Sequence, residues 1–121
     1  MNGEGANPDS LVVRFLERTR ADVGRLRTLA TSLRLDGHAQ FMEIEQIAHS
    51  IHGTGAMIGF PAVSKSGGAI EHCVDLLICP ESKGQAVAPA VRVRLLELIE
   101  ALARALDAAH ATKPSESAMF R

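Results

Sequence analysis

Two histidines in the stretch IAHSIHGTGAMIGF, residues 47–60, could do chemistry because of their type and spacing. His49 and His52 are three positions apart, and three glycines follow within the same stretch. A neutral imidazole has a lone pair on one ring nitrogen, and its ordinary pKa of about 6.5 keeps it largely neutral near pH 7. Such a nitrogen can act as a nucleophile or as a metal ligand.

Helical spacing places these histidines beside a face that is expected to be buried. One apolar stripe would face the core, formed by Ile44, Ile47, Ala48, Ile51, Gly55 and Ile58. Glu45, His49, His52, Gly53 and Ala56 lie to one side of that stripe. Gly53 follows His49 by one turn, so the position next to the imidazole has no side chain. Bare surface beside an accessible imidazole suits phosphoryl transfer, in which the ring nitrogen carries a bulky group and another protein approaches closely.

The spacing of apolar residues predicts four amphipathic helices, which would position this stretch. The first is predicted near residues 9–35, and the second carries the stripe from Phe41 to Ile58 and closes at Gly59. The third runs from Val63 to Pro80, and the last carries the apolar residues from Val91 to Leu106. No segment alternates as a half-buried strand does. The sequence therefore predicts an all-α fold, an antiparallel up-and-down four-helix bundle.

Composition limits the domain organisation and the classes of function. The 121 residues suffice for one domain, and we expect flexible tails at 1–8 and 112–121 around a bundle at 9–111. The 13 basic and 14 acidic residues give a net charge of −1, which argues against a nucleic-acid-binding protein. No secretory signal or membrane-spanning segment is evident, so the expected location is cytoplasmic and no membrane partner is expected.

The stretch around His49 resembles the signature of histidine-containing phosphotransfer (HPt) domains. In that signature a histidine is followed by an apolar residue, often a lysine, then a glycine, a small residue and a further glycine. The matching residues are His49, Ile51, Gly53, Gly55 and Gly59. The apolar helix that follows the signature here has Glu71 near its middle.

This resemblance implies a phosphorelay intermediate with His49 as the phosphoacceptor. Such a domain accepts a phosphoryl group from a receiver aspartyl phosphate or a histidine kinase, and it passes the group to a response-regulator receiver domain. It would be a phosphocarrier rather than an enzyme, because the receiver supplies Mg²⁺ and most catalytic groups. We expect no cofactor and no metal on this chain, which we predict to be a monomer.

Further roles are expected for the neighbours of His49. Gly53 would give clearance to the phosphoryl group, although it could instead permit close helix packing. Glu45, one turn before His49, could accept a hydrogen bond from the ring, or be only a solvated acid. The predicted partner contacts are Ala56, Met57 and Lys65. Gly67 and Gly68 have no assigned role, and close packing, a local kink and receiver contact are all open for them.

One departure from the family pattern leaves other functions open. His52 stands where the family often has a lysine, and the chain has no lysine or arginine between Arg34 and Lys65. A bundle that binds a kinase or receiver without being phosphorylated, as a scaffold or inhibitor, is the main alternative. A metal site is a weaker one, with His49 and His52 as an H-x-x-H pair completed by His72 or Cys73. A kinase dimerisation domain fits less well, because no acidic residue follows His49 directly.

Overall fold

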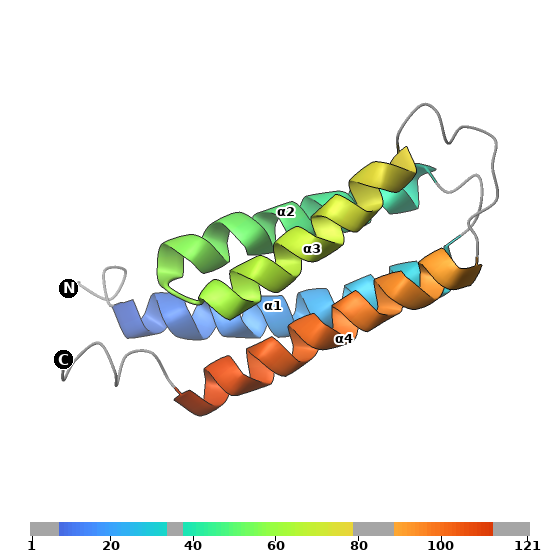
Figure 1. The fold of residues 1–121 in the computed structure, drawn as a ribbon. Coiled ribbons are helices and arrows are strands. Elements are labelled where there is room, and N and C mark those ends of the chain that lie inside the picture. Colours follow the sequence, from blue (N-terminus) through green and yellow to red (C-terminus); the bar gives the residue numbers. More distant parts are fainter. Residues whose placement is uncertain (1–7, 34–37, 79–88, 113–121) are drawn as a thin grey trace.

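Four helices run alternately up and down in the computed structural model, which describes residues 8–33, 38–78 and 89–112. They are α1 (Pro8–Thr31), α2 (His38–Ile58), α3 (Pro61–Ile78) and α4 (Pro89–Thr112). Neighbours along the chain are antiparallel, as Figure 1 shows. No strand occurs within the described ranges. The predicted all-α antiparallel bundle is confirmed.

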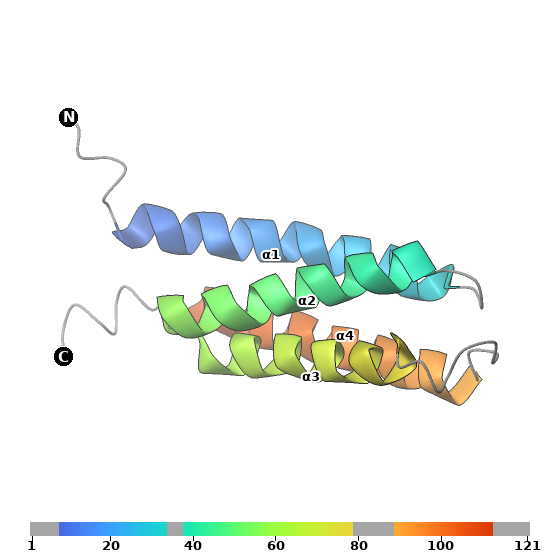
Figure 2. The same cartoon turned by 90° about the horizontal axis from the view of Figure 1, so that it is seen from above.

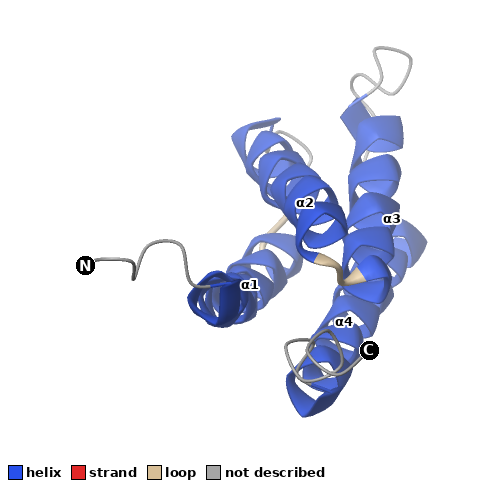
Figure 3. Ribbon diagram, turned by 90° about the vertical axis from the view of Figure 1, so that its left-hand side faces the viewer, coloured by secondary structure: helices blue, strands red, loops and turns tan. Residues whose placement is uncertain are grey.

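The helices, which Figure 3 shows from one end of the bundle, pack around one apolar core. Every helix contributes side chains without measurable exposure, among them Leu26, Ile44, Ile70, Val74, Leu95, Ile99 and Leu102. The predicted stripe of α2 lies on this core, with Ile44, Ala48 and Ile51 buried and Ile47 and Ile58 half-buried. The side of α2 that carries His49 and His52 is therefore left at the surface. No helix in the described ranges is long and apolar enough to cross a lipid bilayer.

Helix α1 ends earlier than predicted, at Thr31 rather than near residue 35. The amide of Leu33 donates to the carbonyl of Ala30, three residues earlier. This bond makes a tighter turn than the α-helical bond to the fourth residue back, and it closes the helix. Arg92 of α4 then donates a hydrogen bond to the carbonyl of Leu33. A cation at this end also complements the negative end of the helix dipole. Residues 34–37, with the predicted Asp36-Gly37 stop, lie outside the described residues.

A tight turn joins α2 to α3. Gly59 has a φ of +102°, which a residue with a side chain rarely adopts, so its predicted role in closing α2 is confirmed. The amide of Phe60 donates to the carbonyl of Gly55 at 2.8 Å and caps the helix end. The Phe60 ring stacks on Phe15 of α1 with 5.8 Å between centroids, and Pro61 begins α3.

Helices α2 and α3 lie side by side, as Figure 2 shows, and glycines allow them to approach closely. A Cβ atom at Gly67 would lie 2.9 Å from Ile51 Cγ2 and 3.0 Å from the backbone nitrogen of His52. A Cβ at Gly55 would lie 3.1 Å from the backbone nitrogen of Ser64. Close packing thus accounts for Gly55, a member of the predicted core stripe, and for Gly67. It also sets the distance across which side chains of α2 and α3 can meet.

Candidate functional site

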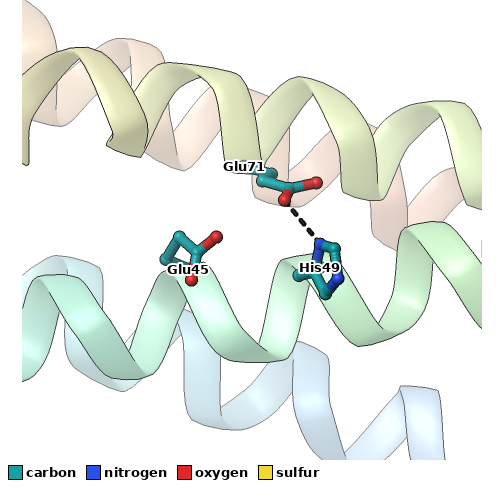
Figure 4. A group of neighbouring side chains, drawn as sticks. All are labelled: Glu45, His49 and Glu71. Atoms are coloured by element: carbon teal, nitrogen blue, oxygen red, sulfur yellow. Dashed lines mark hydrogen bonds and ion pairs between the residues drawn. The ribbon is translucent and has the colours of Figure 1, made fainter.

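His49 lies on the exposed side of α2 and contacts a carboxylate of α3. Its side chain is 72% exposed, and its Nδ1 atom is 2.6 Å from Oε2 of Glu71. Figure 4 shows the ring and the carboxylate meeting between the two helices. The Glu71 side chain is only 17% exposed, so the acid is held at the helix interface while the imidazole faces solvent.

The protonation states follow from this contact. Partial burial works to raise the pKa of Glu71, but the hydrogen bonds from His49 and His52 outweigh it and hold that pKa below its ordinary value. Glu71 is therefore ionised near neutral pH and can only accept hydrogen bonds. Nδ1 of His49 must then be the donor, so the neutral ring has its lone pair on Nε2. The hydrogen bond to Glu71 and its charge also raise the pKa of His49.

His52 contacts the same carboxylate through its other oxygen. Its Nδ1 atom is 3.2 Å from Oε1 of Glu71, and its side chain is half exposed. A Cβ at Gly68 would lie 3.3 Å from the His52 ring, so the absent side chain leaves room for the imidazole. The hydroxyl of Ser64 donates to the carbonyl of His52 at 2.6 Å and ties α3 to α2 at this level. One carboxylate thus orients both imidazoles.

Glu45 lies near His49 but is not the acceptor for its ring. One oxygen of Glu45, a nitrogen of His49 and an oxygen of Glu71 all lie within 4.8 Å of one another. Among the described contacts the ring bonds to Glu71, so of the two roles left open for Glu45 the hydrogen bond from His49 is not formed. Spacing along one helix could not find Glu71, which belongs to α3. The only signal in the sequence was its place in the apolar helix after the signature.

The surface around Gly53 is open. Nothing lies within 4 Å of a Cβ placed there, so the alternative that Gly53 permits close helix packing is wrong. Gly53 is exposed and one helical turn beyond His49. Clearance beside the imidazole remains the prediction for this residue.

The three predicted partner contacts all lie at the surface. Ala56 and Met57 are exposed on α2, and Met57 shows 86% of its area to solvent. Lys65 is exposed on α3, one turn before Gly68. A shallow groove of about 430 Å³ between α1 and α2 ends at Met57 and Ile58, away from the imidazoles. Met57 therefore adds apolar surface between this groove and the His49 side of α2.

The ligands of the alternative metal site, the His49 and His52 pair with His72 or Cys73, do not come together. Within the described residues, the one cluster of possible ligands is Glu45, His49 and Glu71, and it includes neither His72 nor Cys73. His72 is exposed next to Glu71 in sequence, and burial raises the pKa of the half-buried Cys73 thiol, which favours its unreactive form. Two acids from different helices, rather than a second histidine, complete the group around His49.

Comparison with known proteins gives one family. A family model described as Hpt domain matches residues 10–112, which includes all four helices almost completely. Comparisons with curated proteins and with solved structures gave no significant match.

Proposed function

We propose, from the premise that this chain belongs to the Hpt domain family, that His49 is its phosphoacceptor. The family implies phosphotransfer in two-component signalling by a phosphocarrier module. The observation that carries the residue assignment is the exposed imidazole whose Nδ1 is bonded to Glu71. This bond leaves the lone pair of Nε2 for attack on phosphorus.

In the proposed reaction this chain supplies the nucleophile, and the receiver supplies the phosphoryl group and the metal. Nε2 attacks the phosphorus of a receiver aspartyl phosphate, an N–P bond forms, and the P–O bond to the aspartate breaks to release its carboxylate. While Nδ1 keeps its proton, the phosphorylated ring gains positive charge, which the Glu71 carboxylate counters at hydrogen-bond distance. Reversal of the same steps hands the group to a second receiver. Mg²⁺ is bound by the receiver in this proposal.

Positive charge for the phosphoryl group would come from His52 only in its protonated form, and from Lys65 of α3. His52 is three residues after His49, and its ring is held by Glu71. Lys65 lies on α3 three residues before Gly68, which packs against the His52 ring, so Lys65 and Gly68 lie on the same side of that helix. We propose that these two residues replace the lysine of the family pattern, together with cations of the partner.

Partners would dock on the exposed sides of α2 and α3 around Ala56, Met57 and Lys65. The small apolar surface at Met57 suits a transient contact, which a relay needs in order to release its partner. The proposed partners are a histidine kinase or hybrid kinase and response-regulator receiver domains, with this chain acting as a monomer in the cytoplasm.

The test is transfer from a phosphorylated receiver domain to the purified chain. We expect acid-labile, base-stable label on the wild type and on His52→Gln, and none on His49→Gln. A third variant, Gly53→Gln, places a long side chain one turn from His49 in open space, so it should fold normally yet accept label about tenfold more slowly. Circular dichroism would check that each variant is folded.

The same experiment separates the relay from the scaffold or inhibitor alternative. If receivers from a broad panel bind the wild type but none labels it, the chain is a scaffold and the assignment of His49 is wrong. Label that persists on His49→Gln would also contradict the assignment, because another residue would then carry the phosphoryl group.

A further inference from the structure

We propose that Glu45, His49 and Glu71 form a binding site for a divalent transition metal of the zinc type. This differs from the expectation, drawn from the sequence, that the chain binds no metal. The three residues each offer one ligand atom, and these atoms lie within 4.8 Å of one another. An imidazole nitrogen with two carboxylate oxygens is a ligand set that suits Zn²⁺ and leaves a position for water.

The geometry needs only small side-chain movements to accept the ion. Figure 4 shows Glu45 and His49 one turn apart on α2, with Glu71 opposite on α3. Zinc bonds of about 2.0–2.2 Å place tetrahedral ligands roughly 3.4 Å apart. The 2.6 Å contact between Nδ1 of His49 and Glu71 would therefore open slightly, and Glu45 would close in. Because His49 is exposed and Glu45 half-buried, both side chains have room to adjust.

A neighbouring hydrogen bond supports this assignment. Ligating carboxylates in metal sites are usually oriented by a further hydrogen bond to the oxygen that does not bind the ion. His52 is placed to do this, since its Nδ1 is 3.2 Å from Oε1 of Glu71 while Oε2 faces His49. The cluster thus has three ligands and a fourth side chain that fixes one of them.

Metal binding would remove the nucleophile. In the neutral ring of the free protein Nδ1 carries the proton and Nε2 the lone pair. An ion bound through the Nδ1 lone pair takes the place of that proton, which moves by way of water to Nε2 of the neutral ring. Nε2–H has no lone pair for attack on phosphorus, so the metal would compete with phosphorylation. This consequence rests on the proposed function, whereas binding itself does not.

The binding test is a calorimetric titration of the purified full chain with zinc chloride in a buffer that does not chelate. We expect one equivalent to bind, with Kd raised about tenfold or more in Glu45→Gln and in Glu71→Gln. His72→Gln and Cys73→Ala are matched controls on α3 that remove possible ligands outside the cluster, and they should keep the wild-type affinity. Nitrogen NMR of the His49 ring should show Nδ1 coordinated and Nε2 protonated.

Several results would overturn the site: no saturable binding, a loss of binding in a control variant as large as in Glu45→Gln, or coordination of His49 through Nε2.

Inhibition is tested separately, by the initial rate of labelling from a receiver with and without zinc. Each variant is compared with its own zinc-free rate. Glu45→Gln should be about tenfold less sensitive to zinc than the wild type. Equal sensitivity would contradict competition, because any effect of zinc on the receiver is common to both. If zinc binds as predicted but no chain is labelled even without zinc, the proposed function fails while the metal site stands.

Discussion

The Glu71 carboxylate determines which nitrogen of the neutral His49 ring has the lone pair. It accepts hydrogen bonds from both imidazoles, one to each of its oxygens. Its partial burial keeps it at the helix interface, where it cannot turn to solvent as a fully exposed acid would. A single acid thereby sets the tautomer and the orientation of two rings.

The pH dependence of His49 should reflect this hydrogen bond. Because Glu71 raises the pKa of His49, the ring stays protonated to higher pH, and the reactive neutral form grows as pH rises through that raised pKa. In Glu71→Gln the pKa should fall, so the neutral form should appear at lower pH. NMR titration of the His49 ring protons measures this directly. Glu97→Gln on α4 is the control and should leave the titration unchanged; an unmoved curve in Glu71→Gln would contradict the argument.

For single residues, the sequence could predict which side of its helix a residue occupies, but not which residue of another helix it contacts. Helical periodicity correctly placed His49, His52 and Gly53 on the exposed side of α2. It suggested Glu45 as hydrogen-bond partner because Glu45 is one turn away on the same helix. The partner is Glu71, and which residue of α3 lies opposite His49 depends on how the two helices are set against each other. That setting comes from contacts such as Gly67 against Ile51, which no local pattern contains.

Among the elements, α2 and α3 form the tightest pair, and their glycines make it possible. We expect Gly67→Ala to destabilise the fold by about 1–2 kcal/mol, because the methyl group would press on the backbone of α2, and this overpacking exceeds the gain in helix propensity. Gly24→Ala is the matched control, since Gly24 is an exposed helical residue and a Cβ placed there would have nothing within 4 Å. It should stabilise the fold by about 0.5–1 kcal/mol. Urea unfolding measures both, and Gly67→Ala as stable as Gly24→Ala would show that the helices can move apart freely.

Helix existence was predictable, whereas one helix end was not. The apolar stripes and the Gly59-Phe60-Pro61 sequence correctly predicted four helices and the turn between α2 and α3. The predicted end of α1, near residue 35, was about one turn beyond the observed end at Thr31. Its position is set by the closing bond from Leu33 to Ala30 and by Arg92, which belongs to a helix far along the chain. Long-range contacts of this kind leave no periodic signal near the residue they affect.

For the whole molecule, the exposed sides of α2 and α3 form the proposed docking face. Met57→Glu should weaken binding of a receiver domain about tenfold, because it places a charge in an apolar contact, without lowering the free energy of unfolding. Val93→Glu is the control: Val93 is 54% exposed and belongs to α4, across the bundle from α2. Calorimetric titration with a receiver measures both. Equal weakening by the two substitutions, or none by Met57→Glu, would contradict this docking face.

The short turn at Gly59 also affects how the molecule acquires its site. Glu45, His49, His52 and Glu71 all belong to one helical hairpin, so the contacts of Glu71 with His49 and His52 span only 22 and 19 residues of the chain. Closing a short loop costs little chain entropy, and proteins rich in local contacts fold quickly. We therefore expect the hairpin to be among the earlier parts of the bundle to form. The imidazoles and their carboxylate would then meet early in folding, before the core is complete.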